Sequence, residues 1–146
     1  MAGGDEMTTR GAKKYLNEIK HKRQQLDRMK ARRAALHIDV SFGSINYSSD
    51  KIKGTPQNKL ENAMLKLSEA LERVDREIAR LSVEIDERLE SIEKLQDSNY
   101  KDVLFKRYSE YKSLEEISGE MGYSYGYTCS LHGDALKEIS KVLNFS

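Results

Sequence analysis

Apolar residues recur at helical spacing along most of the chain, and the longest such pattern lies in its middle. From Leu60 to Leu95 these residues follow a heptad repeat in two interleaved registers. The heptad positions are Leu60, Leu67, Val74, Leu81, Arg88 and Leu95 in one register, and Met64, Leu71, Ile78, Ile85 and Ile92 in the other. Ten of these eleven positions are apolar and the intervening residues are mostly charged, which predicts a coiled-coil helix. Thr55 and Pro56 mark its start, because a cap residue followed by proline favours the first turn of a helix.

A second helical pattern occupies residues 9–36. Its apolar residues fall on one stripe, and the opposite side is nearly all cationic. Residues 37–55 contain Ser, Gly, Asn and Asp without a sustained period, so we predict a long loop there. Residues 1–8 are expected to be a disordered tail. The two helices are therefore predicted to form a long antiparallel hairpin over residues 9–97.

The lengths of the two predicted helices suggest a second subunit. At about 1.5 Å per residue the heptad helix is roughly 60 Å long, whereas the first helix has only about 28 residues. The stripe on the first helix also contains Lys22 and Arg33. We therefore expect a homodimer through residues 60–95. The alternative is a monomeric hairpin whose excess apolar seam is covered by the C-terminal domain.

The C-terminal residues 98–146 carry the pattern of a compact helix-turn-helix domain. Ser113 and Glu116 fit a capping box at the start of a short helix, and Gly122 can take the left-handed geometry that ends it. Ser124 can cap the next helix. The inner face of the first of these helices is Leu114, Ile117 and Met121, and that of the second is Thr128, Leu131, Ala135 and either Leu136 or Ile139. The whole chain is thus predicted to be all-α.

Composition narrows the possible functions. Charged residues make up 34% of the chain, proline occurs once and tryptophan is absent, which is typical of helices with large solvated faces. The single cysteine excludes an internal disulfide, and His21, His37 and His132 lie in different segments, so we expect no metal and no other cofactor. The sequence has no membrane-spanning run, no signal peptide, no Gly-rich phosphate loop and no nucleophile with a paired base. These features predict a cytoplasmic protein that is not an enzyme.

Charge is strongly segregated although the net charge is only +1. Residues 10–33 contain ten Lys and Arg against two acids, whereas residues 57–97 contain seven against eleven. From residue 98 onward there are six bases and seven acids, so the helix-turn-helix lacks a basic cluster of its own. The basic helix is predicted both to pair with the acidic helix and to leave cationic surface for nucleic acid.

The C-terminal stretch resembles a known group of domains. The run Leu104-Phe-Lys-Arg-Tyr-Ser-Glu-Tyr-Lys-Ser-Leu-Glu-Glu-Ile-Ser-Gly-Glu-Met-Gly-Tyr-Ser-Tyr125, followed by Leu131-His132-Gly133 and Ala135-Leu136, resembles sigma-factor region 4-like domains of small phage and prophage proteins. These are related to the ArpU/RinA-type late transcriptional regulators of phages that infect Gram-positive bacteria. The resemblance is strong over residues 98–140 and weaker around Lys14-Tyr15-Leu16. It implies a regulator that binds double-stranded DNA in a bacterial host cell, and it allows contact with host RNA polymerase.

The sequence departs from this group in its recognition helix. Relatives commonly carry basic residues where this chain has Gly126, Ser130 and Asp134, which removes the usual readers of guanine. The residues then available for the DNA groove are Ser124, Tyr125, Tyr127, Ser130 and His132. Flanking phosphate contacts are predicted for Lys106, Arg107 and Lys112, with secondary contacts from Lys20, Arg23, Lys30 and Arg32. For His132 a structural role within the domain is the stronger prediction, and Tyr100, Tyr108 and Tyr111 are interpreted as packing residues.

Three functional hypotheses follow. The first is a phage-type transcriptional regulator that binds DNA through the helix-turn-helix. The second is a protein-interaction module that binds a host or phage protein through the coiled coil, with its DNA role reduced or lost, and it accounts better for the missing arginines. The third and weakest is a small terminase-like packaging component, which would form a ring-sized oligomer.

Overall fold

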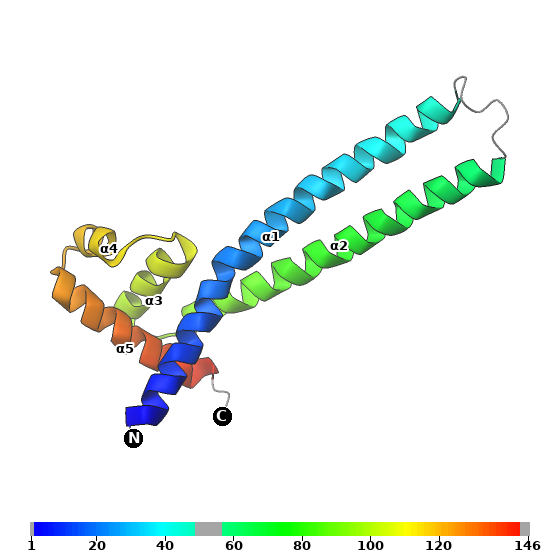
Figure 1. Cartoon of the computed structure of the whole chain (residues 1–146). Coiled ribbons are helices and arrows are strands. Elements are labelled where there is room, and N and C mark those ends of the chain that lie inside the picture. The colour runs from blue at the N-terminus through cyan, green and yellow to red at the C-terminus, as the bar shows by residue number, and fades with distance from the viewer. Residues whose placement is uncertain (1, 49–56, 144–146) are drawn as a thin grey trace. The chain divides into compact units, whose positions relative to one another are not determined.

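The computed structural model describes residues 2–48 and 57–143, with side chains over 9–39 and 57–143. The elements are the helices α1 (Ala2–Ser48), α2 (Gln57–Glu93), α3 (Ser98–Leu104), α4 (Leu114–Met121) and α5 (Tyr125–Leu143), with a short π-helix, η2 (Phe105–Ser109), after α3 (Figure 1). The described residues contain no strand, which confirms the predicted all-α class. None of the described helices is both long and apolar enough to cross a membrane.

Helix α1 is longer than the sequence pattern predicted. Residues 2–8, predicted to be a tail, and residues 37–48, predicted to begin a loop, are both helical. The rest of that loop, including the Thr55-Pro56 signal, lies outside the described residues. The only proline of the chain is Pro56, so α1 contains no residue that lacks a backbone amide hydrogen. The Ser, Gly and Asn residues within 37–48 weaken a helix but do not end it here.

The chain divides into two compact units, each of which contains part of α1 and part of α2. The first unit comprises residues 1–23 and 83–146, and the second comprises residues 24–82. This division differs from the predicted boundary between residues 97 and 98. The reason is that α1 contributes side chains to the core around which α3, α4 and α5 pack.

The core of the first unit contains side chains from every described helix. Leu16 and Ile19 on α1 are fully buried in one cluster with Leu104 on α3 and Ile117 on α4. The other buried residues of the cluster are Ala12, Ile92, Leu95, Val103, Tyr108, Leu131, Ala135, Leu136, Ile139 and Leu143. Burying a leucine or isoleucine stabilises a fold by about 1.5–3 kcal/mol, so the start of α1 is an integral part of this unit.

The helix-turn-helix geometry agrees with the local sequence signals. Ser113 Oγ accepts a hydrogen bond from the Glu116 amide (3.1 Å), and a Glu116 carboxylate oxygen accepts one from the Ser113 amide (3.3 Å). Gly122 ends α4 at a φ of 74°. Thr128, Leu131, Ala135, Leu136 and Ile139 are buried on the inner face of α5. The capping box, the glycine stop and the apolar face predicted from sequence are confirmed.

One charged residue occupies the heptad seam, and it lies in the first unit. The Arg88 guanidinium lies 4.3 Å from the Tyr15 ring centroid. It donates hydrogen bonds to the Tyr15 carbonyl (3.1 Å), the Glu84 carbonyl (3.0 Å) and the Glu18 carboxylate (3.2 Å). These contacts stabilise the guanidinium charge between α1 and α2, which explains why an arginine can occupy this heptad position.

In the second unit, the corresponding parts of α1 and α2 lie side by side and antiparallel (Figure 1). Leu36, Val74 and Leu81 are buried. Arg33 pairs with Asp75 at 2.5 Å, and the Gln25 amide donates to the Glu77 carboxylate at 3.4 Å. The predicted pairing of basic and acidic helices is therefore present here.

The length difference between the two helices that suggested a dimer is not present in the structure. Helix α1 has 47 residues against 37 for α2, so the first helix is not too short to cover the second. None of the eleven heptad positions is classed as exposed within the chain itself. The homodimer through residues 60–95 stays a prediction, without the length argument that suggested it.

Candidate nucleic-acid interface

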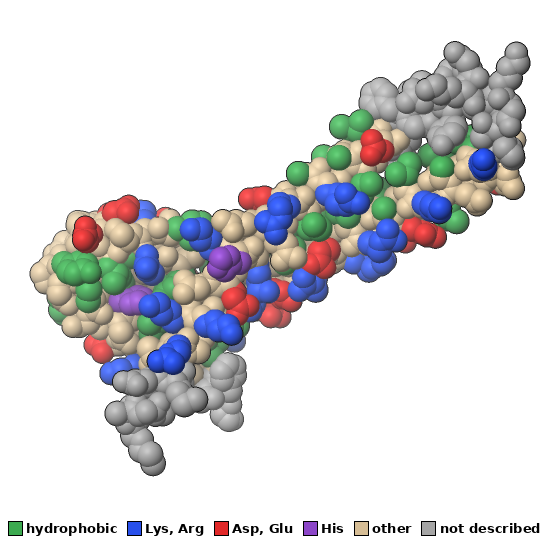
Figure 2. Space-filling view, viewed as in Figure 1, with side chains coloured by type: hydrophobic (Ala, Val, Ile, Leu, Met, Phe, Trp, Pro, Cys, Tyr) green, Lys and Arg blue, Asp and Glu red, His purple; other side chains and the backbone are tan. Residues whose placement is uncertain are grey.

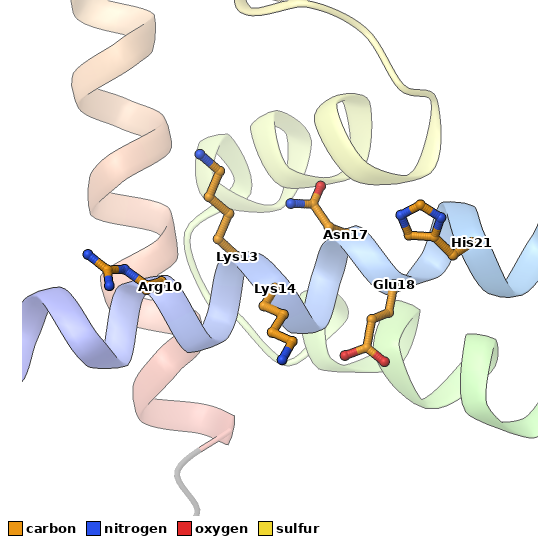
Figure 3. Close-up of a pocket in the computed structure, with 6 residues that line it drawn as sticks. All are labelled: Arg10, Lys13, Lys14, Asn17, Glu18 and His21. Carbon is orange, nitrogen blue, oxygen red and sulfur yellow. The ribbon is translucent and has the colours of Figure 1, made fainter.

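One face of α1 in the first unit is cationic. Its side chains lie three, four and seven residues apart, so they share one side of the helix. They line a shallow hollow: Arg10, Lys13, Lys14, Asn17, Glu18 and His21 (Figure 3). Figure 3 shows Lys13 and Asn17 extending from one edge of the helix and Lys14 and Glu18 from the other. Glu18, the one acid of this lining, is engaged by Arg88 at 3.2 Å.

The bases on this face are available to an outside partner. Arg10, Lys13, Lys14 and Lys20 form no ion pair within the part of the chain that the structure describes. By contrast, Lys22 is neutralised by Glu84 at 2.9 Å. On the face shown in Figure 2, lysine, arginine and histidine side chains gather over the first unit. We call Arg10, Lys13, Lys14 and Lys20 the α1 basic face.

The opposite side of the same helix turns carries the apolar residues that attach α1 to the helix-turn-helix core. Ala12, Leu16 and Ile19 are at most 3% exposed. The basic cluster therefore belongs to the helix-turn-helix unit, although it lies far from it in sequence. Sequence reasoning missed Arg10, Lys13, Lys14 and Asn17 as site residues, because it paired the first helix only with α2. The signal was present in the apolar stripe that includes Leu16 and Ile19.

Arg23, predicted to be a secondary phosphate contact, is instead occupied within the first unit. Its guanidinium donates to the Ser109 carbonyl (2.7 Å), to Ser109 Oγ (3.1 Å) and to the Tyr111 hydroxyl (3.1 Å). Tyr111 has a φ of 61°, a left-handed conformation that is uncommon for a residue other than glycine. Arg23 thus fixes the turn that leads into α4. Tyr111 remains 41% exposed, so its predicted packing role is only partial.

A second hollow lies between α1 and η2, and Lys20 and Arg107 share it. Its volume is about 190 Å³, and its lining is Asn17, Lys20, Arg107, Tyr108 and Tyr111. Arg107 Nη1 donates a hydrogen bond to the Lys112 carbonyl at 2.9 Å. The Lys20 ammonium lies 5.6 Å from the Tyr111 ring centroid. The π-turn contributes to this arrangement, since the Glu110 amide bonds to the Phe105 carbonyl and adds a residue to the turn that carries Arg107.

Lys106 and Lys112, predicted to contact phosphates, converge on one carboxylate. Glu120 accepts from Lys106 at 2.8 Å and pairs with Lys112 at 2.7 Å. Lys112 also lies 3.4 Å from Glu110. The hydrogen bonds from Lys106 and Lys112 lower the pKa of Glu120, and the bond to Glu120 raises the pKa of Lys112. These two bases are therefore partly neutralised by their own domain.

His132 forms part of the domain interior. Its Nε2 lies 2.8 Å from the Tyr108 hydroxyl, and the two rings stack with centroids 5.7 Å apart. Burial, together with the charges of Arg107 and Lys13, lowers the pKa of His132 to about 4, and burial raises the pKa of Tyr108 to about 12. At neutral pH the imidazole is therefore uncharged, and the tyrosine hydroxyl and the imidazole Nε2 share one hydrogen bond. This contact agrees with the structural role predicted for His132.

The two tyrosines predicted to enter the groove are exposed but point in different directions. Tyr125 is 53% and Tyr127 is 51% exposed, and two residues on a helix are about 200° apart. Tyr127 packs edge-on against Tyr123 with ring centroids 4.8 Å apart. A hydrogen bond with the Cys129 side chain raises the pKa of Tyr125. Ser124 Oγ accepts from the Tyr127 amide at 3.1 Å, so its hydroxyl caps α5.

The flank of α5 that carries Tyr127 is acidic. Burial first, and then the charges of Asp134, Asp97 and Glu138, raise the pKa of Tyr100, which also interacts with Tyr127. His132, on the other flank, interacts with Arg107 and Lys13. Lys141 also lies on the acidic flank, where it pairs with Glu138 at 3.2 Å. Ser130 is exposed on α5, and Lys30 and Arg32 are exposed on the second unit.

No group of His, Cys, Asp and Glu within the described residues is suited to hold a metal ion. Comparisons of the chain with protein-family models, with curated proteins and with solved structures find no match.

Proposed function

We propose that the chain is a phage-type transcriptional regulator that binds double-stranded DNA with its helix-turn-helix unit, and that the α1 basic face supplies the phosphate contacts. The single observation that carries this proposal is the attachment of that face to the core of the helix-turn-helix through Ala12, Leu16 and Ile19. The phage assignment rests on the resemblance of residues 98–140 to sigma region 4-like domains.

Phosphate neutralisation supplies a large share of the affinity of a DNA-binding protein. The recognition helix itself provides little of it, because Gly126, Ser130 and Asp134 stand where basic residues are usual. Four bases of α1 in the same unit form no ion pair with any described residue, and we propose that they compensate for this deficit. We therefore expect binding that is strongly salt-dependent and only weakly selective among sequences.

The charges of α4 further restrict how DNA can lie. In a helix-turn-helix complex the first helix crosses the phosphate backbone and the second enters the major groove. Glu115 and Glu116 are exposed in the first turn of α4, and Asp134 is exposed on α5. These carboxylates repel phosphates, so the duplex is expected to favour the side of α5 nearer Arg107 and Lys13.

A charge-reversal pair tests this proposal. The variant Lys13→Glu/Lys14→Glu removes two bases from the α1 basic face, and the control Lys59→Glu/Lys66→Glu reverses two exposed bases on α2. In fluorescence-anisotropy titrations with a duplex, the first variant is expected to lose affinity at least about tenfold, and its salt slope to fall by about 1.8. The control is expected to bind like the wild type. Equal losses in the two variants, with unchanged thermal melting, would refute the proposal.

A protein-interaction function is the second candidate. The sequence predicted that it uses the coiled coil, whereas the one observation that favours it concerns α5. Tyr125 and Tyr127 are both more than half exposed on an arginine-poor helix, and exposed aromatic side chains are frequent at protein interfaces. Under this hypothesis purified bacterial RNA polymerase binds the chain without DNA, and Tyr125→Ala/Tyr127→Ala weakens that binding. The small terminase-like alternative stays a prediction that a ring-sized mass in solution would support.

A further inference from the structure

We infer that the hollow lined by Asn17, Lys20, Arg107, Tyr108 and Tyr111 binds one phosphate group of the duplex backbone. This inference rests on the proposed DNA-binding function and assigns a specific contact to it. We call this feature the Lys20–Arg107 hollow.

The charges of the hollow select an anion. Lys20 and Arg107 both line it, and neither forms an ion pair with any described carboxylate. Two like charges that share a partly enclosed space repel each other, and an anion between them converts this repulsion into attraction. Charge-assisted hydrogen bonds from ammonium and guanidinium groups to phosphate oxygens are among the strongest that proteins form. The Asn17 amide adds a neutral donor at the rim.

The hollow is also held in shape before any ligand arrives. Arg107 is fixed by its 2.9 Å hydrogen bond to the Lys112 carbonyl. Tyr111 is fixed through the 3.1 Å hydrogen bond that its hydroxyl accepts from Arg23. Tyr108 is fixed by its 2.8 Å contact with His132. Pre-organised donors lose less conformational entropy on binding, so the site favours a ligand of matching geometry. A volume of about 190 Å³ accommodates a phosphate group, since one water occupies about 30 Å³.

The surroundings indicate a phosphate of a polymer. Asn17 lines both this hollow and the one on the α1 basic face, so the two hollows are adjacent. Lys13 and Lys20 are seven residues apart on α1, which separates them by roughly 10 Å along the helix axis. A ligand with one charge would use only the hollow, whereas a nucleic-acid backbone presents further phosphates to Lys13, Lys14 and Arg10. The arrangement therefore fits a duplex backbone better than free phosphate.

The inference makes a quantitative prediction about salt dependence. Full-length variants Lys20→Gln, Arg107→Gln and Lys20→Gln/Arg107→Gln are titrated with a duplex over a range of salt concentrations, with Lys94→Gln as an exposed control in the same unit. One shared phosphate contact contributes about 0.9 to the salt slope. Each single variant is expected to lose up to that amount, and the double variant to lose no more than about 0.9 in total. Lys94→Gln is expected to keep the wild-type slope.

The outcomes separate this inference from the function on which it rests. Wild-type protein that shows no salt-dependent duplex binding would overturn both. Wild-type binding with unchanged slopes in all three variants would overturn the hollow alone, and so would a loss of about 1.8 in the double variant. Arg107→Gln removes the hydrogen bond from Arg107 to the Lys112 carbonyl and could therefore misfold. Lys20→Gln leaves that hydrogen bond intact, and Arg107→Lys keeps the positive charge without the planar guanidinium, so the inference can be tested without Arg107→Gln.

A parallel titration with inorganic phosphate distinguishes the source of the group. Saturation of the Arg107 Nε–H signal in an NMR titration at micromolar phosphate, together with variants that keep their duplex affinity, would assign the hollow to free phosphate and overturn the backbone contact. Weak millimolar binding that duplex DNA displaces is the result expected here.

Discussion

The Tyr108–His132 pair shows how single residues of α5 contribute to the interior of the domain. Burial, and then the positive charges of Arg107 and Lys13, disfavour protonation of the imidazole, whose Nε2 lies 2.8 Å from the Tyr108 hydroxyl. From the sequence alone, His132 could face a DNA groove. In the structure its side chain instead packs α5 against η2.

This pair predicts a pH-dependent stability. The pKa of His132 is about 4 in the folded chain and about 6.5 when unfolded, so the unfolded state binds more protons between these values. The stabilisation is complete above about pH 6.5 and is lost as the pH falls toward 4. Allowing for partial solvent access, we expect a loss of about 1–3 kcal/mol across this range.

Urea unfolding at pH 7, 6 and 5 measures this effect. In His132→Gln the free energy of unfolding is expected to depend less on pH than in the wild type, because that histidine no longer titrates. Identical pH dependence in the two proteins would show that His132 is not held in the uncharged form.

Glu120 predicts a gain of binding. Its carboxylate pairs with Lys106 at 2.8 Å and with Lys112 at 2.7 Å, so Glu120→Gln releases Lys106 and leaves Lys112 with Glu110 as its one remaining acidic partner among the described residues. We expect tighter duplex binding and a salt slope steeper by up to about 1.8. Glu69→Gln, an exposed acid on α2, is the matched control. Unchanged affinity in Glu120→Gln would show that DNA does not approach this side of the domain.

At the scale of elements, the sequence predicted helix ends and buried helix faces correctly where they depend on residues a few positions apart. Ser113, Glu116, Gly122 and the apolar face of α5 were predicted correctly, because caps and periodicity act within a few residues. The extent of α1 was not, since helix-weakening residues without a proline do not end a helix reliably.

Contacts between distant segments were the part that sequence could not provide. A stripe of Ala12, Leu16 and Ile19 is apolar whichever helix covers it, so its packing in the helix-turn-helix core needed the structure. The same holds for Arg23 on Ser109 and for the sharing of Glu120 by two lysines. Single-residue chemistry is visible in a sequence, but the identity of its partners is not.

The role of α1 in the first unit predicts a large effect of one core substitution. Leu16 is fully buried, so Leu16→Ala is expected to lower the free energy of unfolding by about 2–5 kcal/mol. Leu65, which is 57% exposed, is the matched control, and Leu65→Ala is expected to change stability by less than about 1 kcal/mol. Urea denaturation followed by circular dichroism measures both. Similar values for the two variants would contradict the packing of α1 in this core.

At the scale of the whole molecule, the net charge of +1 does not show that the two units differ in how their basic residues are paired. Basic residues within the second unit are partly engaged by acids of α2, as Arg33 is by Asp75, whereas the first unit leaves Arg10, Lys13, Lys14 and Lys20 unpaired within the described residues. The proposal of a polyanionic partner depends on this distribution of unpaired charge and not on the net charge of the chain.

The most direct test of this account is the affinity of the full-length chain for a generic DNA duplex, measured as a function of salt concentration. Arg10, Lys13 and Lys14 are each expected to contact one phosphate, and Lys20 and Arg107 are expected to share a fourth. These four contacts predict a linear fall of log K with log salt, with a slope of about −3 to −4. An absence of duplex binding at about 50 mM salt, or a slope near zero, would contradict the central claim that α1 supplies the phosphate contacts of a DNA-binding unit.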